Sequence, residues 1–159
     1  MGFNPSHIGK TYTVEAVEKE LSLGTITQLR FRLARDKGDL TVQPPSTQGR
    51  DRVESVSRKV GERGYVSEAD RDVVALAFDL KESGLEPLIV SDDYAVQNLA
   101  EHMGLGYEAL ANFGIVHRFQ WVMYCPACHR RFEPPEKQCE VCGTDLKRKV
   151  LSKTRIPKH

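Results

Sequence analysis

The sequence lacks any long apolar run, and no stretch approaches the roughly 20 apolar residues that are needed to span a bilayer. Its first residues also lack a basic segment followed by an apolar one, so we expect no secretory signal. The composition has no collagenous or low-complexity signature. These absences predict a cytoplasmic globular protein with no membrane partner. Its 159 residues are enough for one core and a small appendage.

Basic residues are scarce in the first part of the chain, and acidic residues are scarce in the last part. Residues 1–112 contain 13 Lys and Arg against 18 Asp and Glu, a balance of −5. Residues 113–159 contain 10 against 4, a balance of +6, although the whole chain carries only +1. This asymmetry predicts two modules, of which the second suits a polyanion.

Cysteine is also scarce, and all four cysteines lie in one segment with C-x2-C-x10-C-x2-C spacing. They are Cys125, Cys128, Cys139 and Cys142. Two such pairs of thiolates can close a tetrahedral shell around Zn²⁺. The alternatives are a disulfide framework, which a chain without a secretion signal disfavours, and two redox motifs, which would be unusual so close together. We therefore predict one structural zinc ion in a zinc ribbon, since so short a segment has little core of its own.

Basic residues surround the predicted zinc site. They are Arg118, Arg130, Arg131, Lys137, Lys147, Arg148 and Lys149. A surface rich in Lys and Arg beside exposed aromatic residues suits phosphate contacts and base stacking in RNA. The alternative interpretation is a basic tail that is only solvated.

Before the cysteines, helical patterns alternate with short apolar runs. Helical spacing covers residues 14–21, 26–33, 53–60, 70–80 and 94–102, and the strand-like runs are residues 40–43, 87–91 and 107–109. Strands that alternate with helices predict parallel pairing and an α/β sandwich.

The stretch from Pro87 to Ala100 has two adjacent carboxylates, Asp92 and Asp93, between a short apolar strand and a helix. Open α/β sheets bind their ligands at the carboxyl edge of the strands. Two acids at that edge suit a hard cation, but either of them could equally cap the following helix.

Two earlier acids also have two interpretations each. Glu20 lies next to the apolar boundary of its helix, where it could face a cleft or belong to a solvated face. Asp70 lies in the first turn of a helix that opens at Ser67, so helix capping explains it well.

The order of these motifs resembles the Nob-one family. The segments that carry the resemblance are Tyr-Thr-Val at residues 12–14 with Glu20, Val-Ser-Glu-Ala-Asp at 66–70, Val-Ser-Asp-Asp-Tyr-Ala-Val-Gln-Asn at 90–98, and the four-cysteine ribbon. Members of this family are endonucleases that trim the 3′ end of the small-subunit ribosomal RNA precursor. The resemblance implies an α/β fold with a PIN-like parallel sheet sandwiched by helices, followed by a small zinc-ribbon domain. It places the PIN-like domain at residues 1–112, a linker at 113–122, the zinc ribbon at 123–149 and a basic tail at 150–159.

The resemblance also implies roles for individual residues. Glu20, Asp70 and Asp93 match acids that hold Mg²⁺ or Mn²⁺ in the family, and Ser91 matches the small hydroxyl residue of the catalytic motif; Asp92 is the second choice beside Asp93. A cation would make such a cluster of carboxylates favourable and would lower the pKa of a bound water. The implied partners are the ribosomal RNA precursor and the pre-ribosomal small subunit, with RNA contacts from Arg118, Arg130, Arg131, Lys147, Arg148 and Lys149.

One element of the family has no counterpart here. The family begins with an apolar strand that ends in Asp-x-Ser and lies in the middle of the sheet, whereas no Asp precedes Asp36 in this sequence. We expect the neighbouring strands to lack ladder partners as a result. Either Met1 is an internal methionine mistaken for the start, or the chain is naturally shortened. A shortened chain would act as a non-catalytic RNA-binding protein of ribosome assembly.

Overall fold

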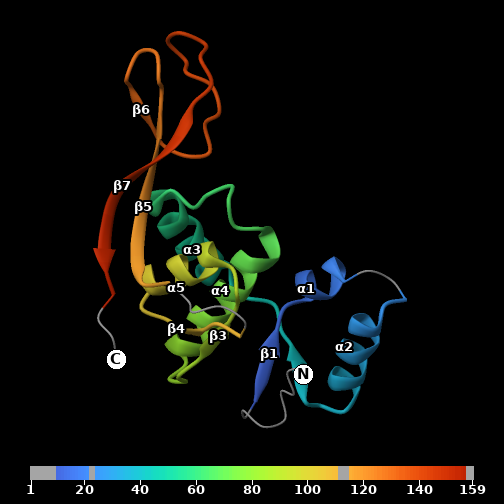
Figure 1. Ribbon diagram of the computed structural model, residues 1–159. Coiled ribbons are helices and arrows are strands. Elements are labelled where there is room, and N and C mark those ends of the chain that lie inside the picture. The colour runs from blue at the N-terminus through green and yellow to red at the C-terminus, as the bar shows by residue number, and fades with distance from the viewer. Residues whose placement is uncertain (1–9, 22–23, 111–114, 157–159) are drawn as a thin grey trace.

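The computed structural model describes residues 10–21, 24–110 and 115–156. An α/β part is followed by an antiparallel sheet that projects from it (Figure 1). The helices are α1 (Glu15–Glu20), α2 (Ile26–Asp36), α3 (Thr47–Val60), α4 (Glu68–Glu82) and α5 (Tyr94–His102). The strands are β1 (Thr11–Thr13), β2 (Leu40–Val42), β3 (Leu88–Val90), β4 (Gly106–Glu108), β5 (His117–Tyr124), β6 (Arg131–Phe132) and β7 (Lys147–Arg155). None of the described helices is long and apolar enough to cross a membrane.

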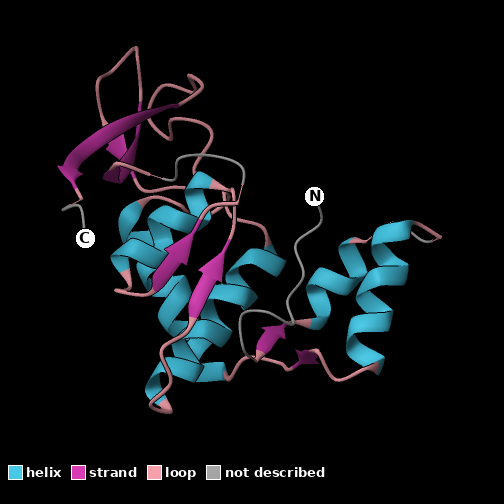
Figure 2. Ribbon diagram, turned by 60° about the horizontal axis from the view of Figure 1, so that its bottom comes forward, coloured by secondary structure: helices cyan, strands magenta, loops and turns pink. Residues whose placement is uncertain are grey.

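The strands of the α/β part pair in parallel, as predicted, but they form two separate pairs. β1 pairs with β2, and β3 pairs with β4. Figure 2 shows the two pairs apart from each other. Within the described residues β1 and β3 each have one ladder neighbour, so each has an unpaired edge.

The main core lies where α3, α4 and α5 pack against β3. Its fully buried members include Val53 on α3, Val74 on α4 and Leu99 on α5, each at most 1% exposed. Ile89 in the middle of β3 joins them and is 4% exposed. Each such side chain contributes about 1.5–3 kcal/mol by leaving water.

Serine caps set the start of both long helices. The Ser46 side chain accepts a hydrogen bond from Gly49 N at the start of α3, and Ser67 accepts one from Asp70 N at the start of α4. Ser46 also donates its backbone N–H and its hydroxyl to Asp79 on α4, at 2.6 and 2.7 Å. The first turn of α3 is therefore attached to α4.

The apolar face of α2 is largely exposed. Ile26, Leu29 and Leu33 share one face at helical spacing, yet they are 70%, 58% and 48% exposed. In Figures 1 and 2 α2 lies away from the α3–α5 core. β3 is also bare on one side, since Leu88 and Val90 are 49% and 36% exposed. Helices therefore cover only one face of β3 within the described residues.

The antiparallel sheet has the order β6-β5-β7 and is longer than the cysteine segment. β5 and β7 pair from His117 with Arg155 to Tyr124 with Lys147, with an irregularity between Gln120 and Trp121. Residues 117–122, expected as linker, form most of β5, and residues 150–155, expected as tail, form most of β7. Two long paired strands therefore connect the cysteine segment to the α/β part.

Candidate functional site

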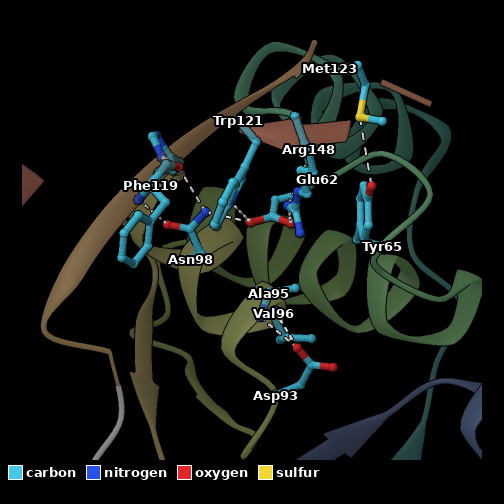
Figure 3. Close-up of polar contacts among 12 residues, drawn as sticks. Glu62, Tyr65, Asp93, Ala95, Val96, Asn98, Phe119, Trp121, Met123 and Arg148 are labelled. Carbon is cyan, nitrogen blue, oxygen red and sulfur yellow. Dashed lines mark hydrogen bonds and ion pairs between the residues drawn. The ribbon is translucent and has the colours of Figure 1, made fainter. Parts of the chain in front are cut away.

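Asp93 lies just beyond the carboxyl end of β3 and is the N-cap of α5 (Figure 3). Its Oδ1 accepts hydrogen bonds from Ala95 N at 2.6 Å and Val96 N at 3.3 Å. Ser91 Oγ accepts a bond from Asp93 N, and the buried Gln97 donates to the Ser91 carbonyl at 2.7 Å. Helix capping thus uses one carboxylate oxygen of an exposed residue, and Oδ2 makes no hydrogen bond to the described residues. Capping and cation binding by Asp93 are therefore compatible.

Asp92 makes a different contact. Its Oδ1 accepts a hydrogen bond from the backbone N–H of Leu110 at 2.9 Å, in the segment that follows β4. The two adjacent acids therefore have different partners: Asp93 caps a helix, and Asp92 connects the ends of neighbouring strands.

Asp70 and Glu20 lie on other elements. Asp70 is in the first turn of α4, and its Oδ2 accepts a hydrogen bond from the Ser67 hydroxyl at 2.8 Å. Glu20 is the last residue of α1 and is exposed. Within the described residues, Glu20, Asp70 and Asp93 do not form a group with closely spaced ligand atoms. Carboxylates without a cation repel one another, and α1 follows β1, which is not paired with β3.

The four cysteines do form such a group. Their Sγ atoms all lie within 4.8 Å of one another, with 3.5 Å between Cys125 and Cys142 and 3.4 Å between Cys128 and Cys139. A Zn–S bond of about 2.3 Å in a tetrahedron separates sulfurs by about 3.8 Å, whereas a disulfide needs about 2.05 Å. The cysteines are free, and two of them are buried. The donor set and spacing therefore fit a structural zinc ion.

Two backbone turns present these thiols. His129 N donates to the Cys125 carbonyl at 3.0 Å, and Gly143 N donates to the Cys139 carbonyl at 2.8 Å. Gly143 has φ 69° and His129 has φ 61°, so both residues that follow a cysteine pair adopt the left-handed conformation. Gly143 adopts this conformation without a steric cost, whereas His129 performs the same turn at a steric cost.

The turns also stabilise the thiolate forms of two cysteines, Cys142 and Cys125. Two hydrogen bonds with Thr144 lower the pKa of the Cys142 thiol to about 6; the bond with the hydroxyl has the larger effect and the bond with the backbone the smaller. The backbone N–H of Cys128, 3.4 Å from Cys125 Sγ, lowers the pKa of Cys125. Thiolates are the form that binds metal, so these hydrogen bonds favour zinc binding near neutral pH.

The β5–β7 strands carry cations beside aromatic rings. Lys149 Nζ lies 5.2 Å from the ring centroid of Tyr124, and Lys153 Nζ lies 5.7 Å from that of Phe119. Desolvation, followed by the charges of Lys153 and Arg155, lowers the pKa of His117. Lys153 and Arg155 were missed by sequence reasoning, which placed them in a tail. Lys153 and Arg155 are two positions apart, as are the aromatic residues Phe119 and His117 with which they pair across the sheet. This matched alternation in the two segments is the signal that would have found them.

The residues predicted to contact RNA are not equivalent. Arg130, Arg131, Lys147 and Lys149 are exposed, and Arg118 is half-buried. Arg148 instead turns toward the α/β part, where its Nη2 donates to Glu62 Oε2 at 2.6 Å. Its guanidinium lies over the rings of Tyr65 and Trp121, 3.7 and 4.1 Å from their centroids (Figure 3).

Comparison with known proteins identifies relatives of this chain. No family model matches the chain. The endoribonuclease Nob1 of Methanocaldococcus jannaschii is 31% identical over an alignment of 160 positions, which covers 99% of this chain and 76% of that protein. Endoribonuclease Nob1 of Archaeoglobus fulgidus is 35% identical over 104 residues, 65% of this chain and 61% of that protein. Ribonuclease VapC1 of Thermoplasma acidophilum is 34% identical over 96 residues, 60% of this chain and 47% of that protein. The chain thus matches about three fifths of the length of the second relative and about half of the third.

Proposed function

Because the chain belongs to the family of Nob1 endoribonucleases, we propose that it is a metal-dependent endoribonuclease. Its proposed substrate is the 3′ end of the small-subunit ribosomal RNA precursor, and its proposed partner is the pre-ribosomal small subunit in the cytoplasm. The first unit is then a PIN-type α/β domain and the second a zinc ribbon. We propose that the ribbon unit begins at β5 and ends with β7, since these strands pair along their whole length.

The observation that carries this proposal is the position of Asp93. It follows a parallel strand at its carboxyl end, it is fixed through Oδ1, and Oδ2 is available to a ligand. Asp93, Asp70 and Glu20 offer the oxygen ligands that Mg²⁺ and Mn²⁺ prefer. A divalent cation bound there would supply an activated water and would stabilise charge on the phosphodiester.

The chain's own residues have separate tasks in this proposal. Gln97 and Ser91 fix the backbone around Asp93, so the carboxylate would meet RNA in one orientation. The exposed basic residues of the ribbon, with Lys153 and Arg155, would bind phosphates, and Phe119 and Tyr124 on β5 would stack on bases. No nucleophilic side chain is required.

Asp93→Asn tests the proposal, because Asn caps a helix about as well as Asp but lacks the charge. We expect the zinc-loaded variant to bind precursor RNA like the unmodified protein, but to lose cleavage with Mg²⁺ or Mn²⁺ by at least about 100-fold. Asp51→Asn, an exposed aspartate on α3, is the matched control and should cleave normally.

Two outcomes would contradict the proposal. If Asp93→Asn cleaves like the unmodified protein, Asp93 is not a metal ligand of the reaction. If the unmodified protein binds RNA but never cleaves it with either cation, even with an Asp-bearing strand added before residue 1, the protein acts as an RNA-binding subunit instead.

A further inference from the structure

A buried carboxylate lies between the two units. Glu62 directly follows the C-cap of α3 and is 2% exposed. A carboxylate removed from water is costly unless charged and hydrogen-bonded partners surround it. Three donors do so here: Arg148 Nη2 at 2.6 Å, Asn98 Nδ2 at 2.8 Å and Trp121 Nε1 at 3.0 Å (Figure 3). We call Glu62, Asn98, Trp121 and Arg148 the Glu62 network.

Each donor of the Glu62 network comes from a different element. Asn98 is on α5, Trp121 is on β5 and Arg148 is on β7. Arg148 also donates to the Gly61 carbonyl at 3.2 Å. The approach is close: a Cβ at Gly61 would lie 2.4 Å from the carbonyl oxygen of Trp121, and its φ of 78° favours glycine. One carboxylate therefore fixes both long ribbon strands against the end of α3.

Asn98 makes a second, more directional contact with β5. Its Oδ1 accepts from Phe119 N at 2.7 Å, and its Nδ2 donates to Phe119 O at 3.0 Å. The side-chain amide thus pairs with both backbone groups of one residue, as a neighbouring strand would. His102, one turn further along α5, contacts the same carbonyl through Nε2 at 2.9 Å.

The helix that makes these contacts is also the helix that presents Asp93. Asp93 is the N-cap of α5, and Asn98 lies five positions later on that nine-residue helix. Asn98 also belongs to the segment that carries the family resemblance. A rigid helix therefore connects the candidate cation ligand to the strand that carries the aromatic side chains.

We propose that Glu62, Asn98 and Arg148 are positioning residues that hold the β5–β7 sheet in one orientation relative to Asp93. RNA bound on the ribbon is then cut at a fixed distance from the bound nucleotides; this second part rests on the function proposed above. Apolar residues of similar volume would stabilise the contact between the units equally well, so stability alone does not require a buried carboxylate. Hydrogen bonds to a charged group are directional, and they therefore define the orientation of the two units as well.

The orientation can be measured without RNA. Residual dipolar couplings of backbone amides in the full zinc-loaded chain should fit one alignment tensor for α3–α5 and β5–β7 together. Glu62→Gln and Arg148→Met should each require two tensors, while the amide spectrum of each unit stays dispersed. Glu54→Gln is the matched control, because Glu54 is also a carboxylate of α3 but forms its ion pairs with Arg58 and Arg63, which lie in the α/β part. A single, unchanged tensor in both variants would overturn the proposal.

Cleavage gives the second measurement. Both variants should keep RNA affinity within about 3-fold but lower kcat by about 10- to 100-fold and cut at several neighbouring positions, because small misplacements cost rate rather than binding. A merely structural role would lower the thermal stability and leave the cleavage position unchanged, and that result would overturn the second part. If the protein does not cleave even with an Asp-bearing strand added before residue 1, the function proposed above fails, and the dipolar couplings alone decide the positioning role.

Discussion

The cysteine site and the acidic site differ in how their ligands are connected. Four thiols between Cys125 and Cys142 are presented by two backbone turns, and they already lie at metal-binding distances. Glu20, Asp70 and Asp93 belong to three elements of the α/β part, and they are not gathered within the described residues. A site with local ligands forms with its own segment. A site with distant ligands depends on the completeness of the sheet that carries them.

Removal of one thiolate should have the largest effect that distinguishes the cysteine site from the acidic site. Cys125→Ser should lower the zinc content from one ion per chain to nearly none, since structural zinc contributes about 10–16 kcal/mol to the folding of small ribbons and fingers. The amide signals of β5, β6 and β7 should collapse, RNA affinity should fall, and the α3–α5 core should keep its spectrum. Zinc analysis and two-dimensional amide spectra measure both parts.

Val141→Ser is the matched control for this experiment, because Val141 is exposed beside Cys142 and offers no thiol. It should keep zinc and the ribbon signals. An intact, zinc-loaded ribbon in Cys125→Ser would contradict the dependence of this unit on a four-thiolate site.

A smaller effect distinguishes the two roles of Asp93. Asp93→Ala removes the cap of α5 and should lower the free energy of unfolding by about 1 kcal/mol, whereas Asp93→Asn should change it by only a few tenths. Both variants should lose cleavage equally. Urea denaturation and cleavage assays on the same preparations make the comparison. If Asp93→Asn lowers the free energy of unfolding as much as Asp93→Ala does, the charge of Asp93 itself stabilises the fold. Loss of cleavage in Asp93→Asn would then no longer identify Asp93 as a metal ligand.

The smallest expected effect is a pH dependence at the contact between the units. Burial, as the largest cause, lowers the pKa of His102. The folded protein therefore binds fewer protons than the unfolded chain once the pH falls below the ordinary value of about 6.5. The contribution of neutral His102 to the free energy of unfolding is therefore complete above about pH 6.5, and it is lost as the pH falls toward the lowered pKa.

His102→Gln tests this, because Gln keeps an N–H donor for the Phe119 carbonyl but does not titrate. Between about pH 7.5 and pH 5.5 the unmodified protein should lose more free energy of unfolding than the variant does. Both chains have the same cysteines, so proton competition for zinc affects them equally. Equal losses in the two proteins would show that His102 does not contribute.

The sequence predicts what is encoded locally. The cysteine spacing predicts the ribbon, Ser67 predicts the start of α4, and helical periodicity predicts α3, α4 and α5. The sequence pattern does not predict β1, because Thr11–Thr13 is too short to show a strand period. The same limit applies to α2: periodicity identifies its apolar face, but only the rest of the fold decides whether anything covers that face.

The contacts between the units could not be predicted. Glu62 precedes Arg148 by 86 positions and Asn98 by 36, so no local pattern connects them. In the sequence Arg148 is simply the middle member of the Lys-Arg-Lys run at residues 147–149. Strand alternation directs its two neighbours to solvent and Arg148 toward the α/β part. The run of three basic residues is therefore visible in the sequence. The sequence does not show that Lys147 and Lys149 face solvent while Arg148 contacts Glu62.

The single tryptophan of the chain lies within the Glu62 network. The Trp121 ring stacks on Phe119, 5.4 Å between centroids, and its other neighbour is the Arg148 guanidinium. Separation of the ribbon strands from α5 would move this indole into water. The protein therefore contains its own optical reporter: emission that is excited selectively in the tryptophan band comes from this one indole, and its wavelength shift follows the docking of the ribbon over time without any added label.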